Sequence, residues 1–278
     1  MSLIDFILNL AGLLLWLNWR SVRFDPLGKR TPATLIGTLR RAEPRRLRRW
    51  HLLAALGGLL LLRALFYWQI GSAAHWTGTL NLSVITLSFR SDYFVRMLWF
   101  SIFSFGLTLG MFYLWLLLLS ILAGPEPLPF HRLVRMPLGG IDRWSRWSKF
   151  LLPLIVTATF WWLANWLLAE LQIIPKPVST AQRFEESLVI GLSSYLTWKY
   201  LAGALLVLHL LNSYIYFGKH PFWGYMNAGA QTLLSPLRAL PLRVGKADFA
   251  PVVGIVLVFL AAELAGRGLV FLYERLPL

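Results

Sequence analysis

The sequence predicts an all-α polytopic membrane protein, with six transmembrane helices and amphipathic hairpins at the membrane interface. Hydrophobic residues make up 57% of the 278 residues and charged residues only 14%, whereas soluble domains carry about a quarter charged residues. Six stretches are apolar over the ~20 residues that a spanning helix needs. This composition disfavours a soluble enzyme and excludes a disordered chain.

The six predicted spans follow one another with polar segments between them. No positive charge precedes the first span and no small-residue cleavage site precedes Arg20, so we expect an uncleaved anchor and not a signal peptide. The third and fifth spans extend to 30 residues, and helices of that length tilt or project beyond the hydrocarbon. The spans are Leu3–Trp19, Leu52–Ile70, Phe94–Ala123, Phe150–Ile174, Leu188–Phe217 and Pro251–Leu272.

Basic residues gather on one side of these spans. The segments after the first, third and fifth spans carry nineteen Lys and Arg, and the opposite side carries four. The positive-inside rule places the basic side in the cytoplasm. We therefore expect a multi-pass protein of the bacterial inner membrane with both termini outside. Ten of the basic residues follow the first span: Arg20, Arg23, Lys29, Arg30, Arg40, Arg41, Arg45, Arg46, Arg48 and Arg49.

This ten-residue basic cluster has two interpretations. It is either an orientation signal alone, or a surface that also binds anionic lipid headgroups or an acidic partner. Each basic residue near an anionic surface contributes ~1 kcal/mol, so ten exceed what orientation requires. Nucleic acid is not expected, because no aromatic stacking pattern accompanies the charges. The predicted partners are the lipid bilayer with anionic headgroups and another membrane protein.

Residues 94–174 and 188–272 form two copies of one predicted unit, preceded by a two-span extension over residues 1–93. Each copy is a long helix, a basic cytoplasmic hairpin and a helix opened by a proline. A unit with two spans returns to its starting side, so the copies share one orientation, unlike the inverted repeats of many secondary transporters. The matching positions are Pro129, Pro137, Gly140, Asp142 and Pro153 in the first copy, and Pro221, Pro236, Lys246, Asp248 and Pro251 in the second.

The second hairpin carries the most specific motif of the chain. Pro236-Leu-Arg238 stands just before Leu240-Pro241, and Gly245-Lys-Ala-Asp248-Phe-Ala-Pro251 opens the last span. This motif resembles the signature of the YggT (YlmG) family of integral membrane proteins, with alanine at 250 in place of the usual serine. The resemblance covers about residues 94–272. In the first hairpin Pro137, Gly140 and Asp142 match it.

The resemblance implies a non-enzymatic role. Members of that family are small membrane proteins of bacteria and plastids, associated with cell division, nucleoid placement, osmotic tolerance and assembly of a membrane cytochrome complex. We therefore expect a scaffold or assembly factor with a basic cytoplasmic face, as a subunit of a larger membrane complex. The alternative is a small channel or transporter linked to osmotic response, and a haem-handling protein is a third class.

The motif residues either shape a rigid turn or form a docking surface for a partner. Asp248 lies where a carboxylate can accept free backbone N–H groups at the start of the last span. Arg238 lies between two prolines, which we expect to hold the backbone extended. Apolar residues at steps of three and four from Phe222 to Leu234 predict a helix in the headgroup plane. The candidate turn or docking residues are Pro236, Arg238, Pro241, Gly245, Asp248 and Pro251.

We single out five of the charged residues within the predicted spans as functional candidates, because charge is costly there. Glu263 and Arg267 have the i, i+4 order that favours an ion pair. Lys199 has a similar predicted depth, so we expect Lys199 and Glu263 to face the bundle interior and pair, directly or through Arg267. The alternatives are a structural ion-pair cluster and an ion or proton path. The five predicted buried charges are Arg63, Glu170, Lys199, Glu263 and Arg267.

No motif predicts a cofactor, a metal site or a catalytic residue. The chain has no cysteine, which excludes thiolate metal sites and cysteine nucleophiles. Only His209 lies within a predicted span, and no second spanning histidine is available to pair with it on a haem. We interpret His209 as a buried, hydrogen-bonded side chain.

Overall fold

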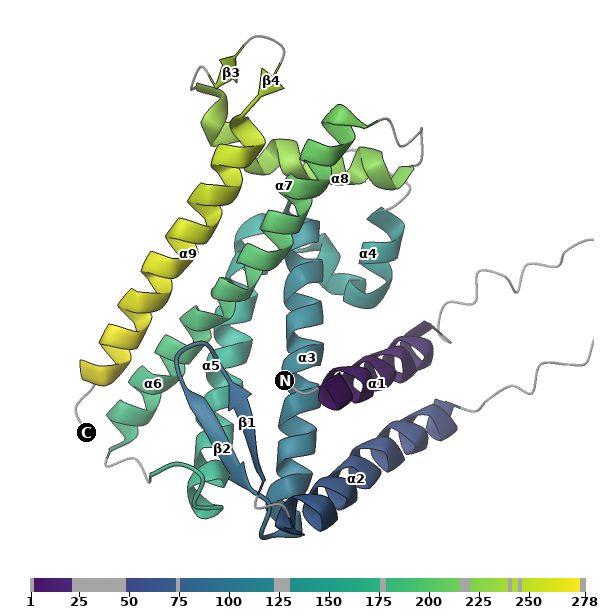
Figure 1. Ribbon diagram of the computed structural model, residues 1–278, viewed down its shortest axis with the longest axis vertical. Helices are drawn as coiled ribbons and strands as arrows, with labels where there is room; N and C mark the ends of the chain where they lie inside the picture. Colours follow the sequence, from purple (N-terminus) through teal and green to yellow (C-terminus); the bar gives the residue numbers. More distant parts are fainter. Residues whose placement is uncertain are drawn as a thin grey trace, which may run out of the picture. The chain divides into compact units, whose positions relative to one another are not determined.

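The structure is a computed structural model in which helices dominate (Figure 1). Among the residues it describes, six segments are long and apolar enough to cross a membrane, which confirms the predicted all-α polytopic fold. The described residues are 3–21, 49–73, 76–122, 131–175, 179–215, 221–239, 242–244 and 247–275.

The elements follow the predicted order closely. They are α1 (Leu3–Ser21), α2 (Arg49–Ala73), β1 (Thr77–Asn81), β2 (Thr86–Arg90), α3 (Phe94–Leu122), α4 (His131–Leu138), η2 (Gly139–Arg143), α5 (Arg146–Glu170), α6 (Thr180–Ser193), η3 (Ser194–Thr197), α7 (Trp198–Tyr214), α8 (Pro221–Leu233), η4 (Ser235–Ala239), β3 (Arg243–Val244), β4 (Ala247–Asp248) and α9 (Ala250–Arg275).

Two spans begin earlier than predicted because serine caps start their helices. The Ser145 hydroxyl accepts a hydrogen bond from the Ser148 N–H at 3.2 Å, so α5 includes a polar first turn. The Ser179 hydroxyl accepts from the Gln182 N–H at 3.1 Å and starts α6. A serine at this position satisfies one of the free N–H groups of the first turn. The fifth span is therefore a composite of α6, η3 and α7.

Contacts divide the chain into two compact units, and the division falls inside β1, β2 and α3. The first unit comprises Met1–Gly78 and Phe89–Leu109, and the second comprises Thr79–Ser88 and Gly110–Leu278. The predicted boundary of the first repeat at residue 94 lies nearby in the chain, and the repeat itself stays a prediction.

A β-hairpin formed by β1 and β2 joins α2 to α3. These strands are not among the elements predicted from the sequence. Both strands alternate exposed and buried residues, with Leu80 and Leu87 buried. Ser83 adopts a φ of 70° in the turn, and its N–H donates to the Asn81 side chain at 2.9 Å. This period-two alternation around a polar turn is the signal that predicts a hairpin.

In the second unit, α8 lies across the ends of other helices (Figure 1). Its apolar face is buried against protein: Tyr225 and Met226 join a core with Leu117 and Leu205. The predicted amphipathic stripe is therefore present. Apolar side chains of α3 and α7 cover this stripe, and the position of α8 in the headgroup plane stays a prediction.

Candidate functional site: buried charge clusters

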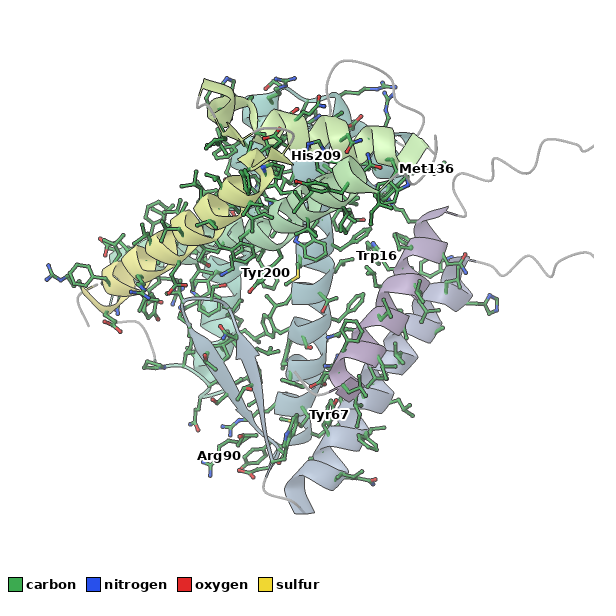
Figure 2. The ribbon with its side chains drawn as sticks, turned by 45° about the horizontal axis from the view of Figure 1, so that its top comes forward. Trp16, Tyr67, Arg90, Met136, Tyr200 and His209 are labelled. Atoms are coloured by element: carbon green, nitrogen blue, oxygen red, sulfur yellow. The ribbon has the colours of Figure 1, made fainter. Side chains whose placement is uncertain are left out.

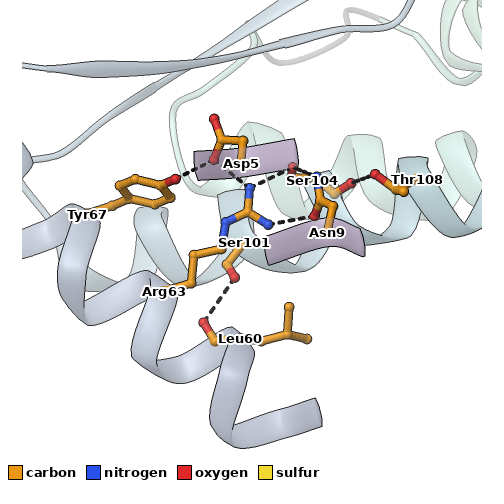
Figure 3. Close-up of polar contacts among 8 residues, drawn as sticks. All are labelled: Asp5, Asn9, Leu60, Arg63, Tyr67, Ser101, Ser104 and Thr108. Carbon is orange, nitrogen blue, oxygen red and sulfur yellow. Dashed lines mark hydrogen bonds and ion pairs between the residues drawn. The ribbon is translucent and has the colours of Figure 1, made fainter. Parts of the chain in front are cut away.

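Arg63 of α2 lies at the centre of a buried polar cluster in the first unit (Figure 3). Its side chain is only 1% exposed, and one terminal nitrogen (Nη2) lies 2.9 Å from the carboxylate of Asp5. That nitrogen also donates to the Ser104 hydroxyl at 2.8 Å, and the other (Nη1) donates to the Asn9 side-chain oxygen at 2.7 Å. Arg63 therefore joins α1, α2 and α3, and its predicted burial is confirmed.

Two helical pairs build this cluster from the sequence upward. Asp5 and Asn9 are four residues apart on α1, and Arg63 and Tyr67 are four apart on α2, so each pair shares one helix face. The Tyr67 hydroxyl donates to Asp5, and the Asn9 amide donates to Ser104 at 3.1 Å. Every one of these side chains is buried. A charge in such an environment is tolerated only when it is paired and hydrogen-bonded.

Asp5 is the partner that sequence reasoning missed. An acidic residue in the first turn of an apolar helix is a common N-terminal feature, and it gave no separate signal. The i, i+4 spacing of Asp5 and Asn9 on an otherwise apolar span was the usable clue. Arg63 also stacks over aromatic rings, with its guanidinium carbon 5.5 Å from the Phe100 ring centre.

A second buried cluster ties a hairpin to its neighbouring spans in the second unit. Asp142 of η2 accepts a hydrogen bond from Ser120 of α3 at 2.6 Å, and its carboxylate lies 3.6 Å from the Lys149 ammonium of α5. Lys149 donates to Ser120 at 2.8 Å, and Arg135 of α4 lies 3.4 Å from the other carboxylate oxygen. The cluster therefore links α3, α4, η2 and α5.

Tyr225 brings α8 to the same region. Its hydroxyl donates to the backbone carbonyl of Leu119 at 3.1 Å. Burial and then the negative charge of Asp142 raise the pKa of this hydroxyl above its ordinary value. Tyr225 therefore stays a hydrogen-bond donor over the physiological pH range.

The other four charges predicted to be buried are placed differently. Glu170, Glu263 and Arg267 are exposed and Lys199 is half-buried, so the expectation of burial is wrong for the first three. The predicted pairing of Lys199 with Glu263 is also wrong. Glu263 pairs with Arg267 at 3.0 Å, which confirms the ion pair predicted from their i, i+4 spacing, while the Lys199 ammonium lies 5.2 Å from the Tyr200 ring centre.

The predicted depth of Lys199 nevertheless fits the packing of α9. A Cβ built on Gly203 would lie 2.8 Å from the Phe259 ring, and one on Gly266 would lie 3.6 Å from Leu196. Lys199 lies between Leu196 and Gly203, and Glu263 lies between Phe259 and Gly266. The two residues therefore lie at the same height along the neighbouring helices. The prediction failed because sequence gives the level of a residue on a helix more readily than its direction.

The family-motif residues are described only in part. Pro236 is exposed in η4, and Pro251 is buried in the first turn of α9. Asp248 accepts a hydrogen bond from the Ala250 N–H at 3.0 Å, which confirms its predicted role at the start of the last span. Pro241 and Gly245 lie outside the described residues.

Arg238 lies in the 3₁₀ helix η4, so the expected extended backbone at this position is wrong. The Leu237 N–H donates a hydrogen bond of 2.9 Å to the Leu234 carbonyl, which forms a helical turn immediately before Arg238. Proline is compatible with the first turn of a helix, and Pro236 occupies that place here. The side chain of Arg238 lies outside the described residues, and its docking role stays a prediction.

His209 of α7 meets α8 at a half-buried polar contact (Figure 2). Its Nδ1 lies 2.9 Å from the side-chain oxygen of Asn227. This geometry agrees with the interpretation of a hydrogen-bonded histidine. Within the part of the chain that the structure describes, no group of three or more His, Cys, Asp or Glu is placed to hold a metal ion.

Comparison with protein-family models, with curated proteins and with solved structures gives no match to this chain. The likeness to the YggT family therefore rests on the motif residues alone.

Proposed function

We propose that this protein is a non-enzymatic assembly or scaffold factor of the membrane and a subunit of a larger membrane complex. The proposal rests on the pairing of buried charged side chains with one another inside the protein. Arg63 pairs with Asp5, and Lys149 pairs with Asp142, each cluster joining separate helices. These ion pairs fix helices against one another, as a rigid frame requires.

The contacts of Arg63 support a structural role for the first cluster. Both terminal nitrogens of its guanidinium already donate to protein oxygens at 2.7–2.9 Å. A group that transfers an ion must exchange partners during transport. Here the partners come from α1 and α3, so exchange would require these helices to separate from α2. Breaking such a pair strongly destabilises a protein.

The cytoplasmic face is proposed to be the basic one, in a bacterial inner membrane with both termini outside. Nineteen basic residues on that side against four on the other support this orientation. Anionic lipid headgroups and a membrane-protein partner are the proposed ligands of this face, and nucleic acid is not expected.

Single cysteines test this orientation cleanly, because the chain has none of its own. Ser145→Cys and Ser235→Cys lie at exposed positions of the two hairpins and should resist an impermeant thiol reagent added outside intact cells. Asp92→Cys, exposed between α2 and α3, should react under the same conditions. Labelling of the hairpin positions with protection of Asp92→Cys would reverse the orientation.

The scaffold proposal is tested by copurification with two motif variants. Arg238→Glu should abolish copurification of the partner while the protein stays folded, because reversed charge opposes a docking contact. Asp248→Ala removes the bond to Ala250 and should lower the amount of folded protein, with partner binding falling only in proportion. Normal copurification by a well-expressed Arg238→Glu protein would remove the docking role.

A small channel or transporter linked to osmotic response is the second candidate. It is favoured by one feature of the first cluster: the Nε atom of Arg63 is buried without a hydrogen-bond partner. Ionisable groups inside a membrane mark solute or ion pathways by default. Ion and solute flux into liposomes containing the protein, compared between wild type and Asp5→Asn, distinguishes this function from the scaffold.

A further inference from the structure

The Glu263–Arg267 pair lies on an exposed side of α9. The two side chains are 57% and 76% exposed, and Arg267 Nε lies 3.0 Å from Glu263 Oε1. Helix α9 runs from Ala250 to Arg275 and is a candidate membrane span. At 1.5 Å per residue, Glu263 lies about 20 Å from the first residue of the helix, close to its middle. The pair is therefore placed well inside the hydrocarbon.

An exposed ion pair at this depth has no suitable partner in lipid. Charged residues within membranes almost always face protein or a water-filled cavity, because lipid tails cannot replace their hydration. Each member of the pair also keeps unused hydrogen-bonding capacity, since a guanidinium has five donors and a carboxylate has about four acceptor sites. The geometry predicts that another protein surface covers this side of α9 in the membrane.

The pair belongs to a regular seam along the helix. Val256, Leu260, Glu263 and Arg267 are spaced by four, three and four residues, which is the heptad spacing of helices that wrap around each other. Val256 and Leu260 are exposed, like the charged pair below them. The contacts of α9 with its own chain involve other positions, such as Phe259 against Gly203. The seam is therefore directed away from the helices that α9 already contacts.

We propose that this seam is the interface with a second copy of the same chain, with the two α9 helices parallel. Two copies in one membrane share an orientation, so a two-fold axis along the membrane normal brings the same face of each together. The face carries one acid and one base and is neutral as a whole. In the pair of copies each Arg267 can bind the Glu263 of both helices, and no net charge is added.

Charge balance favours a second copy over another occupant. A helix with a single acidic or basic residue would leave one uncompensated charge inside the membrane. Polar residues on a heptad seam are also the feature that specifies register and partner number in paired helices. The inference concerns α9 alone and does not depend on the proposed scaffold function.

Disulfide cross-linking in native membranes tests the seam. Val256→Cys and Leu260→Cys should give a covalent species of twice the chain mass. Leu257→Cys and Ala261→Cys are matched controls, because these residues are also exposed on α9 but lie off the seam. They should cross-link weakly. Equal cross-linking at all four positions would indicate random collision and overturn the interface.

Reversing the charge of Arg267 provides a second test of the interface. Adding Arg267→Glu to Leu260→Cys should reduce the cross-linked fraction about tenfold, which is the effect of one or two interhelical polar contacts. Exchanging the two charges, Glu263→Arg with Arg267→Glu, keeps the face self-complementary and should restore cross-linking. Two results would contradict the proposal that a second copy covers the seam. One is a folded exchanged variant that does not cross-link, and the other is a cross-linked species whose mass is not twice that of the chain. If a charge variant does not fold, cross-linking of Val256→Cys and Leu260→Cys with Glu263 and Arg267 unchanged decides between the outcomes.

Discussion

Asp5→Ala is expected to lower the free energy of unfolding by about 3–5 kcal/mol, because it leaves Arg63 charged and buried without its carboxylate. The Arg63 side chain is only 1% exposed, and water cannot replace the lost partner without separating the helices. Denaturant or thermal unfolding in detergent measures this loss.

Two further variants separate the ion pair from general packing damage. Arg63→Met leaves Asp5 with its contact to the Tyr67 hydroxyl, so we expect a smaller loss than for Asp5→Ala. The double variant Asp5→Leu with Arg63→Met should recover much of the stability, because replacing both buried charges by apolar side chains is often near neutral. Strictly additive losses would mean that Asp5 and Arg63 do not act as a pair.

Asp142→Ala is expected to be the next most damaging change, with a loss of ~3 kcal/mol. It removes the acid that pairs with Lys149, whose side chain is 8% exposed, and it leaves the Ser120 hydroxyl without this acceptor. The loss should be smaller than for Asp5→Ala, because the Arg135 partner is half exposed and water can solvate it.

Asp92→Ala is the matched control for this change. Asp92 also pairs with an arginine, Arg90, at 3.6 Å, but both side chains are more than half exposed. An exposed pair of this kind contributes about 0–1 kcal/mol. Equal losses for Asp142→Ala and Asp92→Ala would contradict a structural role for the buried cluster.

The six spans were predictable because long apolar runs have few alternatives in a folded protein. The burial of Arg63 followed from the same argument, since its neighbours along the helix are apolar on every side. Asp5 could not be assigned in this way, because its position in a first turn has an ordinary local explanation. Lys149 falls just before the predicted span that begins at Phe150, and its burial depends on Asp142 and Ser120, which come from other elements.

The failed pairing of Lys199 with Glu263 shows a different limit. Their common level could be inferred from two antiparallel helices of known length. Their directions could not, because successive residues of a helix point about 100° apart. A strong local partner, Arg267, also lies four residues from Glu263 and needs no tertiary contact. Local pairing therefore prevailed over the long-range pair.

If this protein is a scaffold within a larger membrane complex, the particle that it forms in native membranes should have a defined composition. Extraction in a mild detergent followed by native mass measurement should yield a discrete particle. That particle should contain a different membrane protein in fixed ratio to this chain. Recovery of this chain alone, or only with further copies of itself, would contradict the scaffold proposal.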